Sequence, residues 1–192
     1  FTDGNATFVR FPGTESPGES NYRWLTNVVI NEALTHTDLP LEDAIELRNL
    51  TATPVNIGDW WLSDVRNTPR KFRIPNDTTI PANGYVVFYE YEFNNDPTNN
   101  LNAFSLSSGN GDQIVLSTGD TNGDLTGYRT SVDFGAAANG VSFGRYVTSD
   151  SREEFVALSA RSLGADDPGS VAEFRTGTGA ANTYPKVGPV II

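Results

Sequence analysis

The chain has 192 residues with neither cysteine nor methionine, and its 24 acidic and 13 basic residues give a formal net charge of −11. The absence of cysteine excludes disulfide bonds and thiolate metal sites. The negative charge argues against a nucleic-acid partner, which needs clustered Lys and Arg. No apolar run approaches the ~20 residues of a membrane span. Because the chain begins at Phe1 and lacks Met, we expect it to be a piece of a longer polypeptide.

Short apolar runs separated by turn residues predict about ten β-strands and no convincing helix. In chain order, strands are predicted at residues 27–34, 44–47, 60–63, 71–74, 85–91, 104–107, 113–116, 128–134, 141–146 and 155–158. The strands at 128–134 and 141–146 are expected to pair with each other across a Gly/Ala/Asn turn. Many short strands at regular spacing are typical of an all-β sandwich or barrel.

The two ends of the chain differ in composition from the middle. Residues 1–25 and 166–192 are rich in Gly and other small or turn-forming residues, which favours extended linker segments. Tyr22 and the run from Val28 reappear 162 positions later as Tyr184 and the run from Val190. Phe8-Val9 similarly echoes Phe155-Val156.

The simplest account of these echoes is a tandem array of copies. Residues 1–25 would then be a linker or the tail of a preceding copy, and residues 166–192 a linker and the start of a following copy. Chance similarity between short strand-like runs is the alternative.

Seven motifs stand in the order and rough spacing of one known family. They are Val28-Val29-Ile30-Asn31-Glu32, Asp43-Ala44-Ile45-Glu46-Leu47-Arg48-Asn49, Trp60-Trp61-Leu62-Ser63-Asp64, Phe72-Arg73-Ile74-Pro75, Ile80-Pro81-Ala82-Asn83-Gly84-Tyr85, Phe104-Ser105-Leu106-Ser107 and Ser142-Phe143-Gly144-Arg145-Tyr146. Over about residues 26–165 the chain resembles the bacterial lamin-tail domain. The resemblance implies an immunoglobulin-like β-sandwich, usually one module of a large secreted or surface-attached bacterial protein. It supplies no catalytic residues.

Aromatic residues provide the first candidate site. Side chains alternate along a strand, so Trp60 shares a face with Leu62 and should enter the core, while Trp61 points the other way. An exposed Trp61 with Tyr89 and Tyr91 nearby could stack on sugar rings or anchor a protein partner. The more ordinary interpretation is that flanking residues such as Tyr22 or Trp24 cover Trp61.

An acidic loop provides a candidate calcium site. Asp120, Asn122 and Asp124 alternate as oxygen ligands do in calcium loops. Ser131 stands where an EF-hand places its bidentate Glu, and the same sequence is typical of a hairpin tip. Apart from this possible calcium ion, no cofactor is expected.

Catalytic arrangements are weakly represented. His36 is the single histidine and therefore the single candidate base for a catalytic triad, but no nucleophile-elbow sequence accompanies it. Acidic residues on or beside the early strands could in pairs support glycosidic chemistry; they are Glu32, Asp43, Glu46, Asp59 and Asp64. Solvated strand faces explain them better, with buried hydrogen bonds or a calcium cage as alternatives.

The sequence therefore predicts a non-enzymatic β-sandwich module of a larger extracellular or cell-surface bacterial protein. Its role would be spacing, adhesion or binding of a protein or polysaccharide partner, next to neighbouring domains of the same chain. The alternative function is a carbohydrate-binding module built on the aromatic side chains around Trp61.

Overall fold

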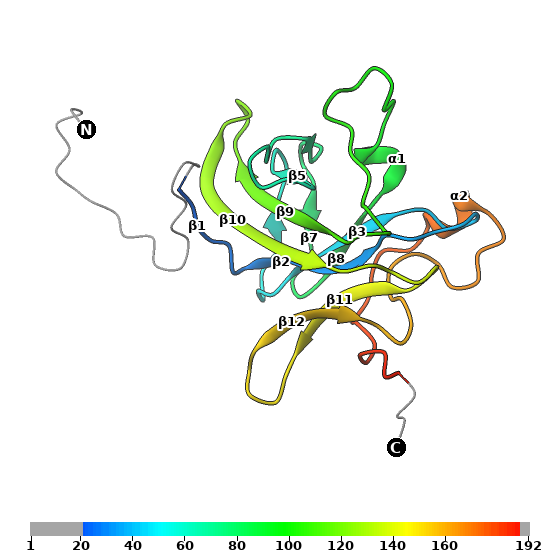
Figure 1. Ribbon diagram of the computed structural model, residues 1–192. Helices are drawn as coiled ribbons and strands as arrows, with labels where there is room; N and C mark the ends of the chain where they lie inside the picture. Colours follow the sequence, from blue (N-terminus) through cyan, green and yellow to red (C-terminus); the bar gives the residue numbers. More distant parts are fainter. Residues whose placement is uncertain (1–20, 189–192) are drawn as a thin grey trace, which may run out of the picture.

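The computed structural model describes residues 21–188, and this part of the chain folds into two packed β-sheets with two single-turn helices (Figure 1). The echoes at Phe8-Val9 and at residues 190–192 lie outside the described residues.

The first sheet has five strands in the order β1-β10-β9-β5-β6. They are β1 (Arg23–Trp24), β10 (Leu125–Phe134), β9 (Asp112–Gly119), β5 (Trp61–Ser63) and β6 (Phe72–Arg73). All neighbours are antiparallel except β1 and β10, which are parallel. The long pair β9 and β10 curves across the front of the molecule in Figure 1.

The second sheet has five antiparallel strands in the order β12-β11-β2-β3-β8. They are β12 (Glu153–Ala157), β11 (Ser142–Val147), β2 (Val28–Leu34), β3 (Ala44–Asn49) and β8 (Tyr85–Tyr89). The chain therefore changes sheet several times, for example between β8 and β9 and between β10 and β11, as it does in an immunoglobulin-like sandwich.

Four shorter elements complete the fold. Strands β4 (Val55–Asn56) and β7 (Thr79–Ile80) form a separate antiparallel pair. Helix α1 (Glu90–Phe93) directly follows β8, and helix α2 (Val171–Phe174) lies in the C-terminal part of the chain. Among residues 21–188 no helix is long and apolar enough to cross a membrane.

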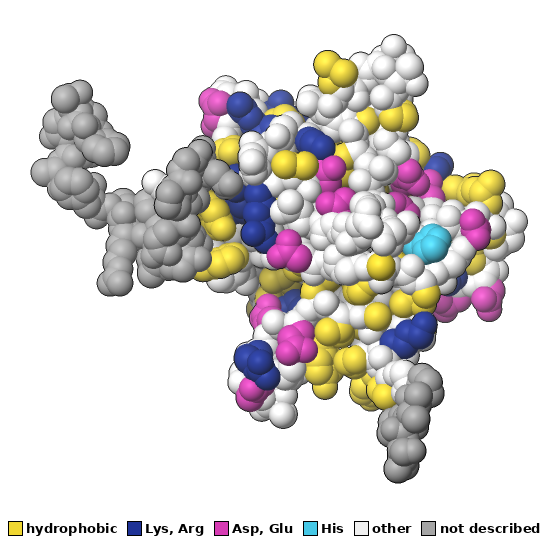
Figure 2. All heavy atoms as spheres, in the orientation of Figure 1, with side chains coloured by type: hydrophobic (Ala, Val, Ile, Leu, Met, Phe, Trp, Pro, Cys, Tyr) yellow, Lys and Arg dark blue, Asp and Glu magenta, His cyan; other side chains and the backbone are white. Residues whose placement is uncertain are grey.

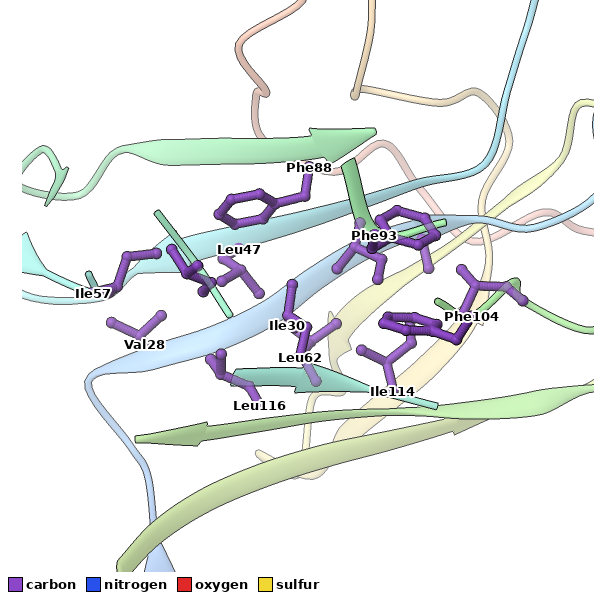
Figure 3. Packing of buried hydrophobic residues seen from close by; sticks show 14 of the residues in the cluster. Val28, Ile30, Leu47, Ile57, Leu62, Phe88, Phe93, Phe104, Ile114 and Leu116 are labelled. Atoms are coloured by element: carbon purple, nitrogen blue, oxygen red, sulfur yellow. The ribbon is translucent and has the colours of Figure 1, made fainter. Parts of the chain in front are cut away.

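The main core fills the space between the two sheets. Inward-facing side chains from β2, β3, β5, β8 and β9 meet there, joined by Phe93 and Phe104, whose rings stack with centroids 4.9 Å apart (Figure 3). Leu62 is completely buried, and Trp60 is partly buried against the same cluster. The predicted all-β sandwich is confirmed.

Strand β2 is unusual because all seven of its residues are buried, Glu32 included. A strand in a two-layer sandwich normally exposes every second side chain to water. The outer face of β2 must therefore be covered by another part of the chain.

Four sequence-based expectations are corrected. Residues 104–107 form no strand, although Phe104 and Leu106 are buried. The strand predicted at 85–91 ends at Tyr89, where α1 begins. Strands β10 and β11 belong to different sheets and do not pair with each other. Residues 166–186 are not a detached linker, because Phe174 among them is completely buried.

Replacing Leu62 by Ala should lower the free energy of unfolding by about 2–5 kcal/mol, because it removes contacts and leaves a cavity in the main core. Denaturant unfolding followed by tryptophan fluorescence measures this change. The matched control is Leu101→Ala at a side chain that is 96% exposed, which should change stability by less than about 0.5 kcal/mol. Equal effects of the two substitutions would contradict this placement of the core.

Candidate functional site: a C-terminal strap anchored on buried carboxylates

The three aromatic residues of the predicted binding platform do not lie together. Trp61 is on β5 in the first sheet, whereas Tyr89 ends β8 in the second sheet and Tyr91 is in α1. Tyr89 is 4% exposed, so the expectation of an exposed ring is wrong at this position. Both faces of β8 are covered at this end, because Phe88 belongs to the main core and Tyr89 packs in a second apolar cluster.

Trp61 is half-buried on the first sheet. The guanidinium of Arg73 lies 5.8 Å from the centre of its ring, and the same Arg73 forms a 2.7 Å ion pair with Asp59. Arg73 therefore lies over the Trp61 ring. A ring already engaged by a cation is a poor platform for stacking on sugars.

Arg73 also occupies the predicted calcium loop. Its guanidinium donates hydrogen bonds to the backbone carbonyls of Asp120 (3.1 Å) and Thr121 (2.8 Å). The Asp120 carboxylate accepts from the backbone N–H groups of Asn122 (2.9 Å) and Asp124 (3.0 Å). The loop is thus a self-capped hairpin tip between β9 and β10, with a cation already bound to its carbonyls.

No cluster of three or more acidic or histidine side chains suited to a metal ion occurs within residues 21–188. The melting temperature should therefore be the same in calcium and in chelator, because calcium would have to displace Arg73. Differential scanning fluorimetry measures this, with magnesium at equal ionic strength as the control. A site filled at 100 times its Kd would add about 2.7 kcal/mol to stability. A calcium-specific rise that Asp120→Asn abolishes would contradict the expectation.

The outer face of the second sheet is covered by residues 159–186, which we call the strap. In Figure 1 the strap is the orange to red segment that includes α2 and passes beside β2 and β3. Leu163 and Phe174 of the strap pack with Leu34, Ala44 and Tyr89 in a small apolar cluster separate from the main core. This cluster explains why β2 is buried on both faces.

Tyr89 and Tyr91 both hold the strap. The Tyr89 hydroxyl donates to the backbone carbonyls of Gly177 (2.7 Å) and Phe174 (3.3 Å), and burial raises the pKa of Tyr89. Arg175 of the strap lies 3.9 Å from the centre of the Tyr91 ring and pairs through two nitrogens with the Glu42 carboxylate, at 2.6 and 2.7 Å. Two of the three predicted binding residues are therefore structural contacts of the strap.

Two buried carboxylates anchor the strap near its two ends, at Ser162 and at Ala180. Glu32 on β2 and Glu46 on β3 are direct cross-strand partners, and both have zero exposure. The prediction of solvated acidic side chains is thus wrong here, and the alternative of buried hydrogen bonds is right. Glu32 accepts the backbone N–H of Ser162 (3.0 and 3.1 Å) and the Ser162 hydroxyl. Glu46 accepts the backbone N–H of Ala180 (3.1 Å).

A β-bulge brings an amide into the same cluster. The pairing of β2 with β3 shifts register between Ile30 and Glu32, which leaves Asn31 without a partner on β3. Asn31 donates to the Glu46 carboxylate (2.5 Å) and to the side-chain oxygen of Asn182 (2.6 Å). Asn182 in turn donates to the backbone carbonyls of Asn31 and Arg145, both at 2.9 Å. These bonds fix the orientation of both amides.

Burial changes the acid–base properties of the pair. Removal from water raises the pKa of Glu32, and it raises the pKa of Glu46 to about 8, with the neighbouring Glu32 adding to the shift. Gly179 makes the close approach possible. It has φ of +87°, and a Cβ atom there would lie 2.4 Å from a carboxylate oxygen of Glu46.

The single histidine is engaged in a loop contact. One ring nitrogen of His36 lies 2.8 Å from the carbonyl oxygen of Ala137. Nearby, Asp43 is 7% exposed and accepts a hydrogen bond from Thr37 at 3.2 Å. Burial raises the pKa of Asp43 to about 7, with the charge of Glu90 adding to the shift. His36 thus links two loops by a backbone contact.

A cleft of about 440 Å³ that the sequence did not indicate lies between the two sheets beside β1 and β12. Its lining includes Trp24, Val29, Val132 and Phe155, together with the ion pair of Arg145 and Glu153. Trp24 is 48% exposed. The lining of the cleft is half apolar and half polar, and its charged residues are mostly acidic.

The comparisons with known proteins agree with this architecture. The family described as Lamin Tail Domain matches residues 25–130, more than half of the chain. The chain therefore belongs to the Lamin Tail Domain family, an immunoglobulin-like structural and interaction domain, as its sequence resemblance indicated. The match ends within β10, so β11, β12 and the strap lie outside it. No curated protein and no solved structure gives a significant match.

Proposed function

We propose that this chain is a non-catalytic spacing or interaction module of a larger secreted or surface-attached bacterial protein, with further copies beside it. The observation that carries the proposal is that the candidate acid–base side chains are engaged in structural contacts. Glu32 and Glu46 have zero exposure and hold the strap, while the His36 ring contacts a backbone carbonyl. Groups occupied in this way are unsuited to acid–base chemistry on a substrate.

Surface charge supports a partner other than nucleic acid. On the face shown in Figure 2, acidic and basic side chains are scattered and do not gather into a basic stripe. The net charge of −11 acts in the same direction by repelling a phosphate backbone. Membership of the Lamin Tail Domain family supports a protein-binding or spacing role.

The cellular proposal predicts that antibodies against residues 21–188 label intact cells of the source bacterium. Labelling should not require permeabilisation, because the module is proposed to lie outside the cell. An antibody against a cytoplasmic protein of the same cells is the control. Labelling that appears only after permeabilisation would contradict the proposed location. The full-length reading frame provides a second check, with further copies expected at a period of about 162 residues, the spacing of Tyr22 and Tyr184.

The carbohydrate alternative is tested on a glycan array. We expect no binding by the wild type, because Tyr89 is buried and Trp61 is covered by Arg73. Trp61→Ala should behave in the same way, and Trp24→Ala, which removes an exposed tryptophan from the edge strand β1 of the first sheet, is the matched control. Glycan binding that Trp61→Ala abolishes and Trp24→Ala preserves, with unchanged melting temperatures, would establish the carbohydrate function.

A further inference from the structure

The strap has the properties of a separable unit. Its apolar contacts belong to the small cluster around Phe174, whereas the main core is formed by other residues. Its backbone pairing with the sheets is short: Lys186 N–H donates to Ala157 O (2.7 Å), next to an isolated bridge between Leu158 and Pro185. Segments with few ladder bonds and few core contacts open locally before the whole domain unfolds.

Hydrogen bonds to the Glu32 and Glu46 carboxylates hold the strap near its two ends, at Ser162 and at Ala180. We propose that this carboxylate pair is a proton-dependent latch, which holds the strap on the second sheet while the pair retains a proton and releases it when that proton is lost.

If both carboxylates in this site were ionised, their two negative charges would not be fully compensated. Directly opposite residues in an antiparallel pair have Cβ atoms about 4.5–5.5 Å apart, and like charges at that spacing repel. The strap contributes only neutral donors here, the backbone and hydroxyl of Ser162 and the backbone of Ala180. Two ionised carboxylates would be contacted directly only by neutral N–H and O–H donors, which makes double ionisation costly in a buried site.

The charged and titratable groups on each neighbouring element do not change this balance. On β3, the guanidinium of Arg48 favours ionised Glu46, but it lies over the Tyr85 ring, 5.3 Å from the ring centre. From β8 come Tyr85, over whose ring this guanidinium lies, and Tyr89, whose hydroxyl donates to the Gly177 carbonyl. On β11, the guanidinium of Arg145 pairs with Glu153, and its backbone carbonyl bonds to Asn182.

Two of the strap's three basic residues, both arginines, bind groups other than the carboxylate pair. The guanidinium of Arg161 donates to the Ala165 carbonyl (3.4 Å), and that of Arg175 binds Glu42. On β2, the neighbour of Glu32 within the cluster is the neutral Asn31. Protonation of the pair therefore remains the available way to remove one charge while the strap is in place.

The direction of the pH effect is set by the two states of the strap. With the strap in place, burial holds the pKa of Glu46 at about 8; once the strap leaves, water returns and the pKa falls toward the ordinary value of 4.5. Release of the strap therefore releases a proton, and a rise in pH favours release. The stabilisation is complete below about pH 4.5, decreases as pH rises, and is lost above about pH 8.

Hydrogen exchange followed by mass spectrometry on the whole 192-residue chain tests the latch between pH 6 and 9, with intrinsic exchange rates corrected for pH. The opening constant of peptides from the strap should increase by up to about tenfold per pH unit as far as pH 8 and then level off. Peptides covering β9 and β10 should show no such increase. A pH-independent strap, or a parallel change in β9 and β10, would overturn the proposal.

Substitution assigns the effect to the pair. Glu46→Gln keeps the shape of the side chain and removes its charge, so the pH dependence of strap opening should largely disappear, and Glu32→Gln should reduce it. The matched control is Glu154→Gln on β12, where the carboxylate is exposed and the wild-type slope should remain. Retention of the full slope in both Glu46→Gln and Glu32→Gln would overturn the latch. If Glu46→Gln does not fold, Glu32→Gln and the wild-type series still decide the question.

Discussion

The fold depends on the pairing of β2 with β3, because this is the part of the second sheet that is buried on both sides. Val28, Ile30 and Leu47 face the main core between the sheets, while Glu32 and Glu46 face outward. An outward carboxylate is ordinarily satisfied by water. Here the strap replaces water with backbone N–H groups, so the two sides of one strand pair are stabilised by different physics, apolar packing inside and polar hydrogen bonding outside.

Local sequence predicted the parts of the fold that local forces decide. The continuous apolar run from Val28 gave a strand because a buried strand needs such a run. The loop at Asp120 forms a hairpin tip, because the Asp120 carboxylate accepts hydrogen bonds from nearby backbone N–H groups. By contrast, the alternation at residues 104–107 indicated burial, not strand pairing. Phe104 and Leu106 enter the core from a loop, where Phe104 stacks on Phe93.

The candidate site was missed because its partners are distant in sequence. Glu32 bonds to Ser162, 130 positions later, and Glu46 bonds to Ala180, 134 positions later. Nothing near Glu32 distinguishes a solvated carboxylate from a covered one. One signal was present in the strap itself, where Phe174 is a large apolar residue within a segment of mostly small and polar ones. A solvent-exposed linker would leave such a side chain in water, whereas a segment that covers a sheet can bury it.

The strap also decides how force on the C-terminal end of the chain reaches the module. Near the C-terminal end of the strap, the backbone of Lys186 pairs with that of Ala157 at the edge of the second sheet. A pull on the chain from beyond this point acts first on that short pairing and on the side-chain hydrogen bonds of the strap. The main core lies on the other side of the second sheet, and it shares no residue with the apolar cluster of the strap. The polar outer layer can therefore yield while the apolar inner layer stays folded, which separates the mechanics of the connection from the stability of the sandwich.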